Sequence, residues 1–452
     1  MPKSLLFKNI RHLVTCDHQD RVLEHVNLLI ENGVITAIGV EAQTADRVID
    51  ASRMAVYPGL INTHHHLYQI LTRNLPQVQN LELFDWLTAL YGLWENLTEA
   101  GVYHSSLAGM GELALHGCTT VFDHHYVFPH AGGDLIAAQF QAADEIGVRM
   151  VASRGSMSLS QKDGGLPPDS VVQTVDEILT DSQRLVETWH DPKPFAMRQM
   201  VLAPCSPFSV TEDLMRQTAL LARSLGVRLH THLAETRDEE RFVLSKTGMR
   251  PLAYMESLGW LGSDVWFAHG IHFTVDELRL MAQAGTGVAH CPASNMKLAS
   301  GAALLPDMLA LHVPVGLAVD GSASNDGSNL MEEMRIAYLL HRHTFAAKAP
   351  SGYEILKIAT RGGAEVLGRP EIGHIGVGMA GDLFAVRENR LSLAGATADV
   401  GSMLATVGLG GPVDYTVVGG RVIVEDGRLT GADEERLTEW VDTDAKRLRE
   451  MN

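Results

Sequence analysis

The chain has 452 residues, of which 46% are hydrophobic and 20% are charged, and its formal net charge at pH 7 is −18. This composition supports a large buried core and is not that of a disordered chain. The negative charge disfavours nucleic acid and anionic membranes as partners, because phosphate binding depends on basic surface. No apolar run reaches the length of a membrane span, and no secretory signal is recognised at the N-terminus.

The four cysteines are scattered, with no paired spacing that would predict a disulfide or a zinc motif. A reducing cytoplasm is therefore the expected compartment. These residues are Cys16, Cys118, Cys205 and Cys291.

Both ends of the chain read as short strands separated by tight turns. The N-terminal strands are predicted at Leu5–Thr15, Val26–Glu31 and Val34–Ile38, and the C-terminal strands at Leu383–Val386, Thr416–Val418 and Arg421–Glu425. Two β-rich ends that flank a long middle predict one small β-sandwich domain built from residues 1–57 and 373–452. The central domain is then residues 58–372.

The middle of the chain alternates short apolar strands with amphipathic helices. Eight strands are predicted, at Leu60–His66, Thr119–His124, Val148–Arg154, Met200–Pro204, Val227–Leu233, Val265–His269, Gly287–Cys291 and Val315–Asp320. This rhythm is typical of a (β/α)₈ barrel, which places its site at the carboxyl ends of the strands.

Two of the intervening helices carry clear boundary signals. A helix is predicted over Glu212–Leu225, with Ser209 and Glu212 at capping-box spacing. A second is predicted over Val275–Ala284, after Thr274, with Gly285 as its C-terminal stop.

Polar residues at the strand ends are the candidates for chemistry. Side chains alternate along a strand, so His64 and His66 point the same way and can share a metal ion. A single strand-end histidine is usually a hydrogen-bonded structural residue, and an Asp before Gly is usually a turn residue. Here several occur at equivalent strand ends, which a barrel brings over one pocket. The others are His230, His232, His269, His290 and Asp320, with Glu235 just beyond the fifth strand.

At these positions the chain resembles the amidohydrolase superfamily, in particular the aminohydrolases that deaminate heterocycles. The resemblance runs through PGLINTHHH, HTHLAE, FAHGIH, HCPASNMKL, AVDGSASND and IGVGMAGDLFAV, so it covers nearly the whole chain. It implies a distorted (β/α)₈ barrel with a small β-sandwich domain, and assembly into a homo-oligomer. It also implies that the metal ligands are His64, His66, His232 and Asp320, with His230 as the competing ligand on the fifth strand.

The resemblance also suggests the metal count and the chemistry. Two-metal relatives use a carboxylated lysine at the end of the fourth strand, and Met200–Cys205 contains none, which favours a single ion. Three imidazoles and a carboxylate suit Zn²⁺, with Fe²⁺ as the alternative. By resemblance, Glu235 protonates a ring nitrogen, Asp320 accepts the proton of the attacking water, and His269 hydrogen-bonds that water or the developing oxyanion. Ammonia or an alkylamine then leaves.

The segment after His66 resembles that of 8-oxoguanine deaminases and of the related hydroxyatrazine N-ethylaminohydrolases. Candidate substrate contacts are Gln69, whose amide offers a donor and an acceptor, together with Trp86, Cys205 and Arg154. The expected substrate is an oxidised purine such as 8-oxoguanine. The alternatives are a hydroxylated triazine, guanine, cytosine or isoxanthopterin. A non-catalytic barrel scaffold is disfavoured, because all four ligand positions and the proton carrier are filled.

Overall fold

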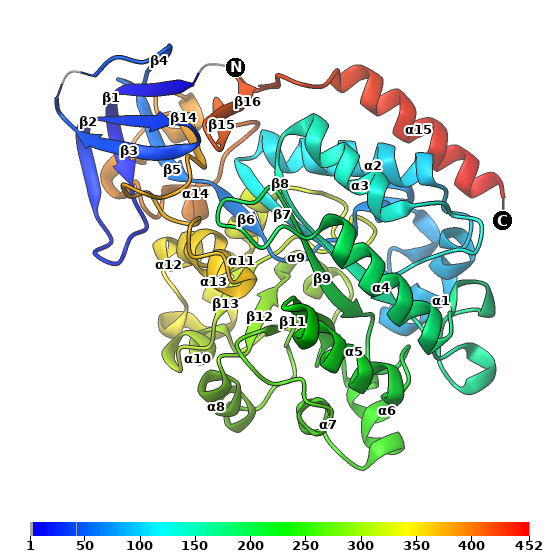
Figure 1. Ribbon diagram of the computed structural model, residues 1–452. Helices are drawn as coiled ribbons and strands as arrows, with labels where there is room; N and C mark the ends of the chain where they lie inside the picture. The colour runs from blue at the N-terminus through cyan, green and yellow to red at the C-terminus, as the bar shows by residue number, and fades with distance from the viewer. Residues whose placement is uncertain (1–2, 42, 452) are drawn as a thin grey trace.

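The computed structural model describes residues 3–41 and 43–451, and its centre is a barrel of eight parallel strands (Figure 1). Each strand pairs with the next in chain order, so the predicted barrel is confirmed. The strands are β6 (Leu60–Asn62), β7 (Cys118–Asp123), β8 (Arg149–Ser156), β9 (Arg198–Pro204), β10 (Arg228–Leu233), β11 (Val265–His269), β12 (Gly287–His290) and β13 (Val315–Leu317).

The barrel closes between its first and last strands through hydrogen bonds just beyond their ends. The backbone N–H and the hydroxyl of Thr63 both donate to the carbonyl of Leu317, at 3.2 and 3.0 Å. One step further, the Asp320 N–H donates to the His64 carbonyl at 3.1 Å. Closure therefore brings the segment with the paired histidines beside the segment with Asp320, although about 250 residues of sequence separate them.

Helices surround the barrel (Figure 1). They are α1 (Leu83–Trp94), α2 (Glu99–Leu115), α3 (Leu135–Ile146), α4 (Val175–Trp189), α5 (Glu212–Leu225), α6 (Arg237–Thr247), α7 (Pro251–Ser257), α8 (Val275–Ala284), α9 (Pro292–Lys297), α10 (Leu305–Ala310), α11 (Leu330–Phe345), α12 (Gly352–Lys357), α13 (Gly363–Leu367), α14 (Met403–Thr406) and α15 (Glu434–Glu450). The bounds predicted for α5 and α8 agree with the structure.

The N-terminal cap of α5 differs from the prediction. Thr211 is the capping residue, and its hydroxyl accepts the Leu214 N–H. The hydroxyl of Ser209 instead hydrogen-bonds with that of Ser206 in the preceding turn, at 2.7 Å. Ser209 precedes Glu212 by the three positions of a capping box. Glu212 is, however, the first residue of α5, so the capping position is that of Thr211.

The two ends of the chain contribute strands to one mixed sheet of nine strands. The N-terminal and C-terminal parts join where β5 pairs with β14 in antiparallel fashion. The strands are β1 (Ser4–Val14), β2 (Val22–Glu31), β3 (Val34–Gly39), β4 (Arg47–Asp50), β5 (Met54–Pro58), β14 (Leu383–Arg387), β15 (Tyr415–Val418), β16 (Arg421–Glu425) and β17 (Arg428–Leu429).

The last helix, α15, packs on the barrel side of the molecule rather than on the terminal sheet. Figure 1 shows it in red beside α2, and the His104 imidazole of α2 lies 2.7 Å from the Asp444 carboxylate of α15. Ala445 and Leu448 of α15 belong to the same buried cluster as Trp86 of α1. The C-terminal segment thus supports the helices near the carboxyl ends of the barrel strands.

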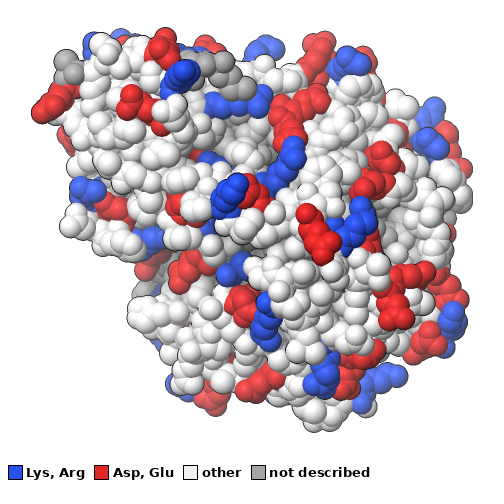
Figure 2. Space-filling view, in the orientation of Figure 1, with Lys and Arg blue, Asp and Glu red and all other residues white. Residues whose placement is uncertain are grey.

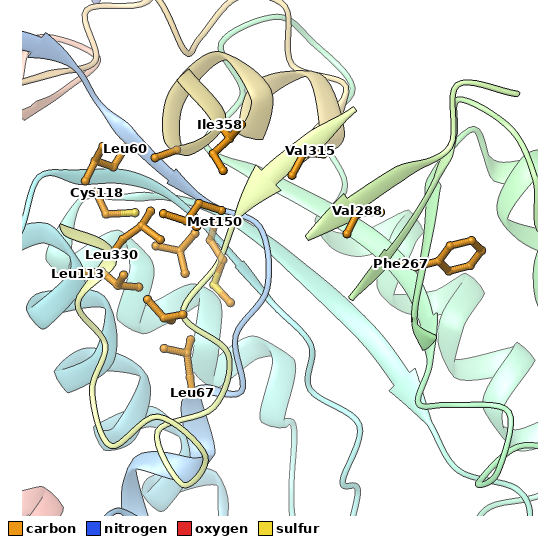
Figure 3. Packing of buried hydrophobic residues seen from close by; sticks show 14 of the residues in the cluster. Leu60, Leu67, Leu113, Cys118, Met150, Phe267, Val288, Val315, Leu330 and Ile358 are labelled. Carbon is orange, nitrogen blue, oxygen red and sulfur yellow. The ribbon is translucent and has the colours of Figure 1, made fainter. Parts of the chain in front are cut away.

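Apolar side chains fill the space between barrel and helices. Figure 3 shows Leu60 and Met150 from the barrel strands with Leu113 of α2 and Leu330 of α11, all in one buried cluster. Burial of one such side chain contributes about 1.5–3 kcal/mol, so this packing holds the strand ends firmly. Within residues 3–41 and 43–451, no helix is long and apolar enough to cross a bilayer. On the face seen in Figure 2, acidic and basic side chains are interspersed.

A buried ion pair fixes the terminal sheet to the barrel. The guanidinium of Arg149, on β8, contacts both carboxylate oxygens of Asp382, at 2.6 and 2.9 Å, and Asp382 also accepts the Gly419 N–H. Both ionic side chains are only 2% exposed.

We expect Asp382→Ala to lower the free energy of unfolding by about 3–5 kcal/mol, because Arg149 would be left as an uncompensated buried charge. Urea denaturation followed by tryptophan fluorescence measures this. Asp169→Ala, which breaks the exposed pair with Lys162, is the control and should leave the midpoint unchanged. An equal, small shift for both variants would contradict the expectation.

Candidate metal centre and active site

Four buried side chains converge at the carboxyl end of the barrel. His64 and His66 follow β6, His232 lies on β10, and Asp320 follows β13. The Nε2 atoms of His66 and His232 are 3.2 Å apart, and Asp320 Oδ1 is 3.3 Å from Nε2 of both His64 and His66. A tetrahedron with metal–nitrogen bonds of about 2.0–2.1 Å has edges of about 3.3–3.4 Å. The spacing of the donor atoms therefore fits an ion the size of Zn²⁺.

The hydrogen bonds of His66 and His232 determine which ring nitrogen is free. His66 Nδ1 donates to the His124 carbonyl and His232 Nδ1 donates to the Cys205 carbonyl, both at 2.7 Å. Each Nε2 then carries a lone pair, and two lone pairs 3.2 Å apart repel unless a cation lies between them. Burial lowers the pKa of both imidazoles well below the ordinary value, which keeps them neutral. Neutral imidazole with its second nitrogen held is the usual form of a metal-binding histidine.

His230 is placed differently from His232, although both lie on β10. Its Nδ1 donates to the Trp266 carbonyl at 2.9 Å, so its Nε2 accepts the Nδ1–H of His64 at 2.8 Å. Both nitrogens of His230 are therefore occupied. This arrangement leaves the Nε2 of His64 with a lone pair, and that buried atom has no hydrogen-bond donor among the described residues.

The geometry at Glu235 and His269 suits proton transfer. His269 ends β11, and its Nε2 lies 3.5 Å from Glu235 Oε2 and 4.0 Å from Asp320 Oδ2. Its Nδ1 donates to Asn295 Oδ1 at 3.0 Å, which fixes the ring. Burial raises the pKa of the Glu235 carboxyl to about 7, so it can hold or release a proton near neutral pH.

Two partners of these side chains come from the HCPASNMKL segment, and neither is among the candidate residues that the sequence analysis names. Asn295 orients His269, and the Ser294 hydroxyl donates to Asp320 Oδ2 at 2.5 Å. The Ser-Asn pair lies in α9, a few residues after the seventh strand, and this was the available signal, since the segments that follow barrel strands form the site.

A cavity opens above the convergent side chains. It is lined by His66, Gln69, Leu83, Trp86, Leu87, Tyr126, Cys205, Phe208, His232, Glu235, His269, Leu298, Asp320 and Ser324. Three of the four predicted substrate contacts, Gln69, Trp86 and Cys205, are therefore present in the lining.

Gln69 lies in the short helix η1 (Leu67–Thr72), and its amide rests against Gly321, directly beside Asp320. A Cβ atom at Gly321 would come within 1.9 Å of the Gln69 amide oxygen, so only glycine permits this approach. The Gln69 amide therefore lies at the edge of the cluster that contains the Asp320 carboxylate.

Arg154 is not among the residues that line the cavity. Its buried guanidinium contacts Asp181 Oδ2 and Gln173 Oε1, both at 2.7 Å, and lies over the ring of Phe128. Its position near a strand end was the reason for the prediction, but its hydrogen bonds direct it to α4 and the adjoining loop.

The fold and this site are those of a hydrolase with a candidate site for a divalent metal, and comparison with known proteins gives the same class. The model of the amidohydrolase family matches residues 55–423, so the chain belongs to the amidohydrolase family. Members and relatives include deaminases and aminohydrolases, and the enzyme is a hydrolase that acts on C–N bonds.

Similar proteins cover nearly the whole chain. An 8-oxoguanine deaminase of Pseudomonas aeruginosa is 45% identical over 410 residues, 90% of this chain and 91% of that one. A hydroxydechloroatrazine ethylaminohydrolase of a Pseudomonas species is 41% identical and covers 97% of this chain and 94% of that one. The crystal structure of atrazine chlorohydrolase from Arthrobacter aurescens, complexed with zinc, has a TM-score of 0.93 at 34% identity and covers 98% of this chain and 100% of that one.

Proposed function

We propose that the protein is a hydrolytic deaminase of an amino-substituted heterocycle, and that it converts 8-oxoguanine and water to urate and ammonia. One observation carries the chemical part of this proposal: three imidazole lone pairs and a carboxylate converge beside a buried, protonatable Glu235. The 45% identity to an 8-oxoguanine deaminase supports the choice of ring.

The residues that would hold the metal are His64, His66, His232 and Asp320. Zn²⁺ suits this donor set, with Fe²⁺ as the alternative, and β9 offers no lysine at its end for a second ion. When bound, such a cation supplies Lewis acidity that lowers the pKa of water towards about 7.

The chain's own residues would divide the proton transfers. Asp320 accepts a proton from the attacking water, and Glu235 delivers a proton to a ring nitrogen of the substrate, which weakens the aromatic system at the amine-bearing carbon. His269 would bind the developing oxyanion as an imidazolium: burial opposes the charged ring, but the carboxyls of Glu235 and Asp320 raise its pKa, so Nδ1–H donates to Asn295 and Nε2–H is left to donate to the oxyanion. Positioned acid–base groups of this kind contribute about 10²–10⁴-fold to a rate.

The cavity offers groups that suit a flat ring with polar edges. The Trp86 Nε1 is buried without an acceptor among the described residues, and the Gln69 Oε1 is likewise buried without a donor. A lactam edge of an oxidised purine has a carbonyl that would accept from Trp86 and an N–H that would donate to Gln69. Each of these buried protein atoms, left unpaired, costs about 1–3 kcal/mol. Cys205 contributes to the lining and has no role as a nucleophile.

A second candidate is hydrolytic removal of an alkylamine from a hydroxylated triazine. The hydroxydechloroatrazine relative matches 97% of this chain, and apolar lining residues such as Leu83, Leu87 and Phe208 would suit an alkyl substituent. Both reactions use the same metal and the same proton carrier, so the cavity lining decides between them.

Ammonia release from 8-oxoguanine, guanine, cytosine and isoxanthopterin, and ethylamine release from hydroxyatrazine, tests the proposal. We expect 8-oxoguanine to give the highest kcat/KM, and we expect prolonged chelation to abolish turnover until Zn²⁺ or Fe²⁺ is restored. Preferred turnover of another ring would overturn the choice of substrate. Full activity in metal-free protein, verified by elemental analysis, would overturn the mechanism.

Two further proposals concern the setting of the reaction. All four cysteines are free and buried, which supports a reducing compartment such as the cytoplasm. We also propose a homo-oligomer, which light scattering of the purified protein tests.

A further inference from the structure

Four helices of the described chain begin with a Ser or Thr cap followed three positions later by Glu. In α4, α8 and α12 the pair forms an ordinary capping box, in which the glutamate accepts the N–H of its own capping residue. For example, Glu177 accepts the Thr174 N–H at 2.8 Å on the exposed surface. The fourth helix, α6, has the same pattern in Thr236 and Glu239 but uses the glutamate differently.

Glu239 reaches back beyond the cap to the turn that carries the catalytic carboxyl. Its Oε1 accepts the Ala234 N–H and its Oε2 accepts the Glu235 N–H, both at 2.8 Å. The side chain is completely buried, whereas Glu177 is exposed. The Thr236 hydroxyl still accepts the Glu239 N–H, so the helix keeps its own cap.

The turn held by Glu239 is not one that the backbone would adopt unaided. Ala234 has φ of +55°, in the left-handed region that alanine avoids, and its carbonyl accepts the His272 N–H at 2.9 Å. Ala234 and Glu235 are both buried, so without Glu239 their two N–H groups would have no acceptor in the described structure. A carboxylate supplies two acceptor oxygens from one side chain, one for each N–H.

We propose that Glu239 is a positioning residue of the reaction: by accepting both N–H groups, it fixes the backbone from which Glu235 extends towards His269. This inference rests on the proposed role of Glu235. The 3.5 Å separation between Glu235 Oε2 and His269 Nε2 then depends on a side chain that neither lines the cavity nor belongs to the proposed metal ligands.

The test is Glu239→Gln in the metal-loaded enzyme, with Glu177→Gln as the matched control. The amide can accept one N–H, but its NH₂ group opposes the other, so the turn relaxes. We expect kcat to fall about 10–100-fold, because small displacements of a catalytic group have effects of this size. KM should stay within about threefold and the metal content should be unchanged. The control removes a comparable acceptor from an exposed cap and should keep the wild-type kcat.

A wild-type kcat in Glu239→Gln would overturn the proposal, as would a loss explained by lost metal or by an increased KM alone. If the glutamine chain does not fold, Glu239→Asp keeps two acceptor oxygens on a shorter side chain, and the same division between kcat and KM is expected.

A crystal structure of metal-loaded Glu239→Gln separates this inference from the choice of substrate. We expect the Glu235 carboxyl to move away from His269, with the metal ligands in place, whichever heterocycle the enzyme uses. An unmoved Glu235 would overturn the positioning role. If no heterocycle is turned over in the activity assay, the proposed function is contradicted. The position of Glu235 in the crystal structure still tests the positioning role, because that measurement does not depend on the substrate.

Discussion

Replacement of Glu235 by Gln is expected to leave the protein folded and loaded with metal but to reduce kcat by about 10²–10⁴-fold. Glutamine keeps the size of the side chain, so the proposed metal ligands His64, His66, His232 and Asp320 should be undisturbed. What it cannot do is donate a carboxyl proton to the ring nitrogen. Steady-state ammonia release together with elemental analysis of the same sample measures both parts.

The pH dependence gives a second readout of the same residue. Burial raises the Glu235 pKa to about 7, so a proton donor at this position is lost as the pH rises through that value. The wild-type kcat should therefore fall on the alkaline side, and the residual activity of Glu235→Gln should lack that limb. Substitution of the exposed Glu177 by Gln is the control. A metal-free Glu235→Gln protein would contradict the role, because it would make Glu235 a ligand rather than an acid.

Much of the barrel was predictable because its buried strands are short apolar runs bounded by turns. The limits of β13 were not. The run Val315–Asp320 predicts six strand residues, but the strand ends at Leu317, and Asp320 adopts φ of +66°. The left-handed turn and the bonds from Thr63 to Leu317 depend on closure of the barrel, which no local pattern encodes.

The terminal segments show which features of the fold the sequence pattern does not determine. Strands at both ends of the chain were evident, but whether they form one sheet or two depends on the pairing of β5 with β14, residues more than 300 positions apart. The side on which α15 packs was equally invisible, because only a few of its residues, such as Ala445 and Leu448, are buried.

The choice between His230 and His232 illustrates the same limit within the site. Alternation along a strand puts both imidazoles on one face, so spacing alone leaves either as a candidate. The structure separates them by their partners: both nitrogens of His230 are used, by Trp266 and His64, whereas His232 keeps Nε2 free. Those partners lie on other strands. Hence the sequence indicates which residues belong to the site, and the three-dimensional contacts indicate which of them can bind a metal.

Removal of a proposed ligand should have a different signature from removal of the acid. We expect His66→Ala and Asp320→Ala each to weaken metal binding by about 100-fold or more, since loss of even an outer partner of a ligand costs about 10–100-fold. Activity should fall in parallel with metal content. Titration of the apoprotein with Zn²⁺ in the presence of a competing chelator measures the affinity directly, without any assumption about the substrate.

His290→Asn is the matched control, because His290 is also a buried histidine at a strand end, on β12, and contacts His341 rather than the cluster. It should retain wild-type affinity for the metal. If His66→Ala bound Zn²⁺ as tightly as His290→Asn, the lone pairs of His66 and His232, 3.2 Å apart, would need another explanation. One of the two rings would then be protonated at Nε2 and would donate to the Nε2 of the other. The barrel end would be a hydrogen-bonded histidine cluster instead of a metal site.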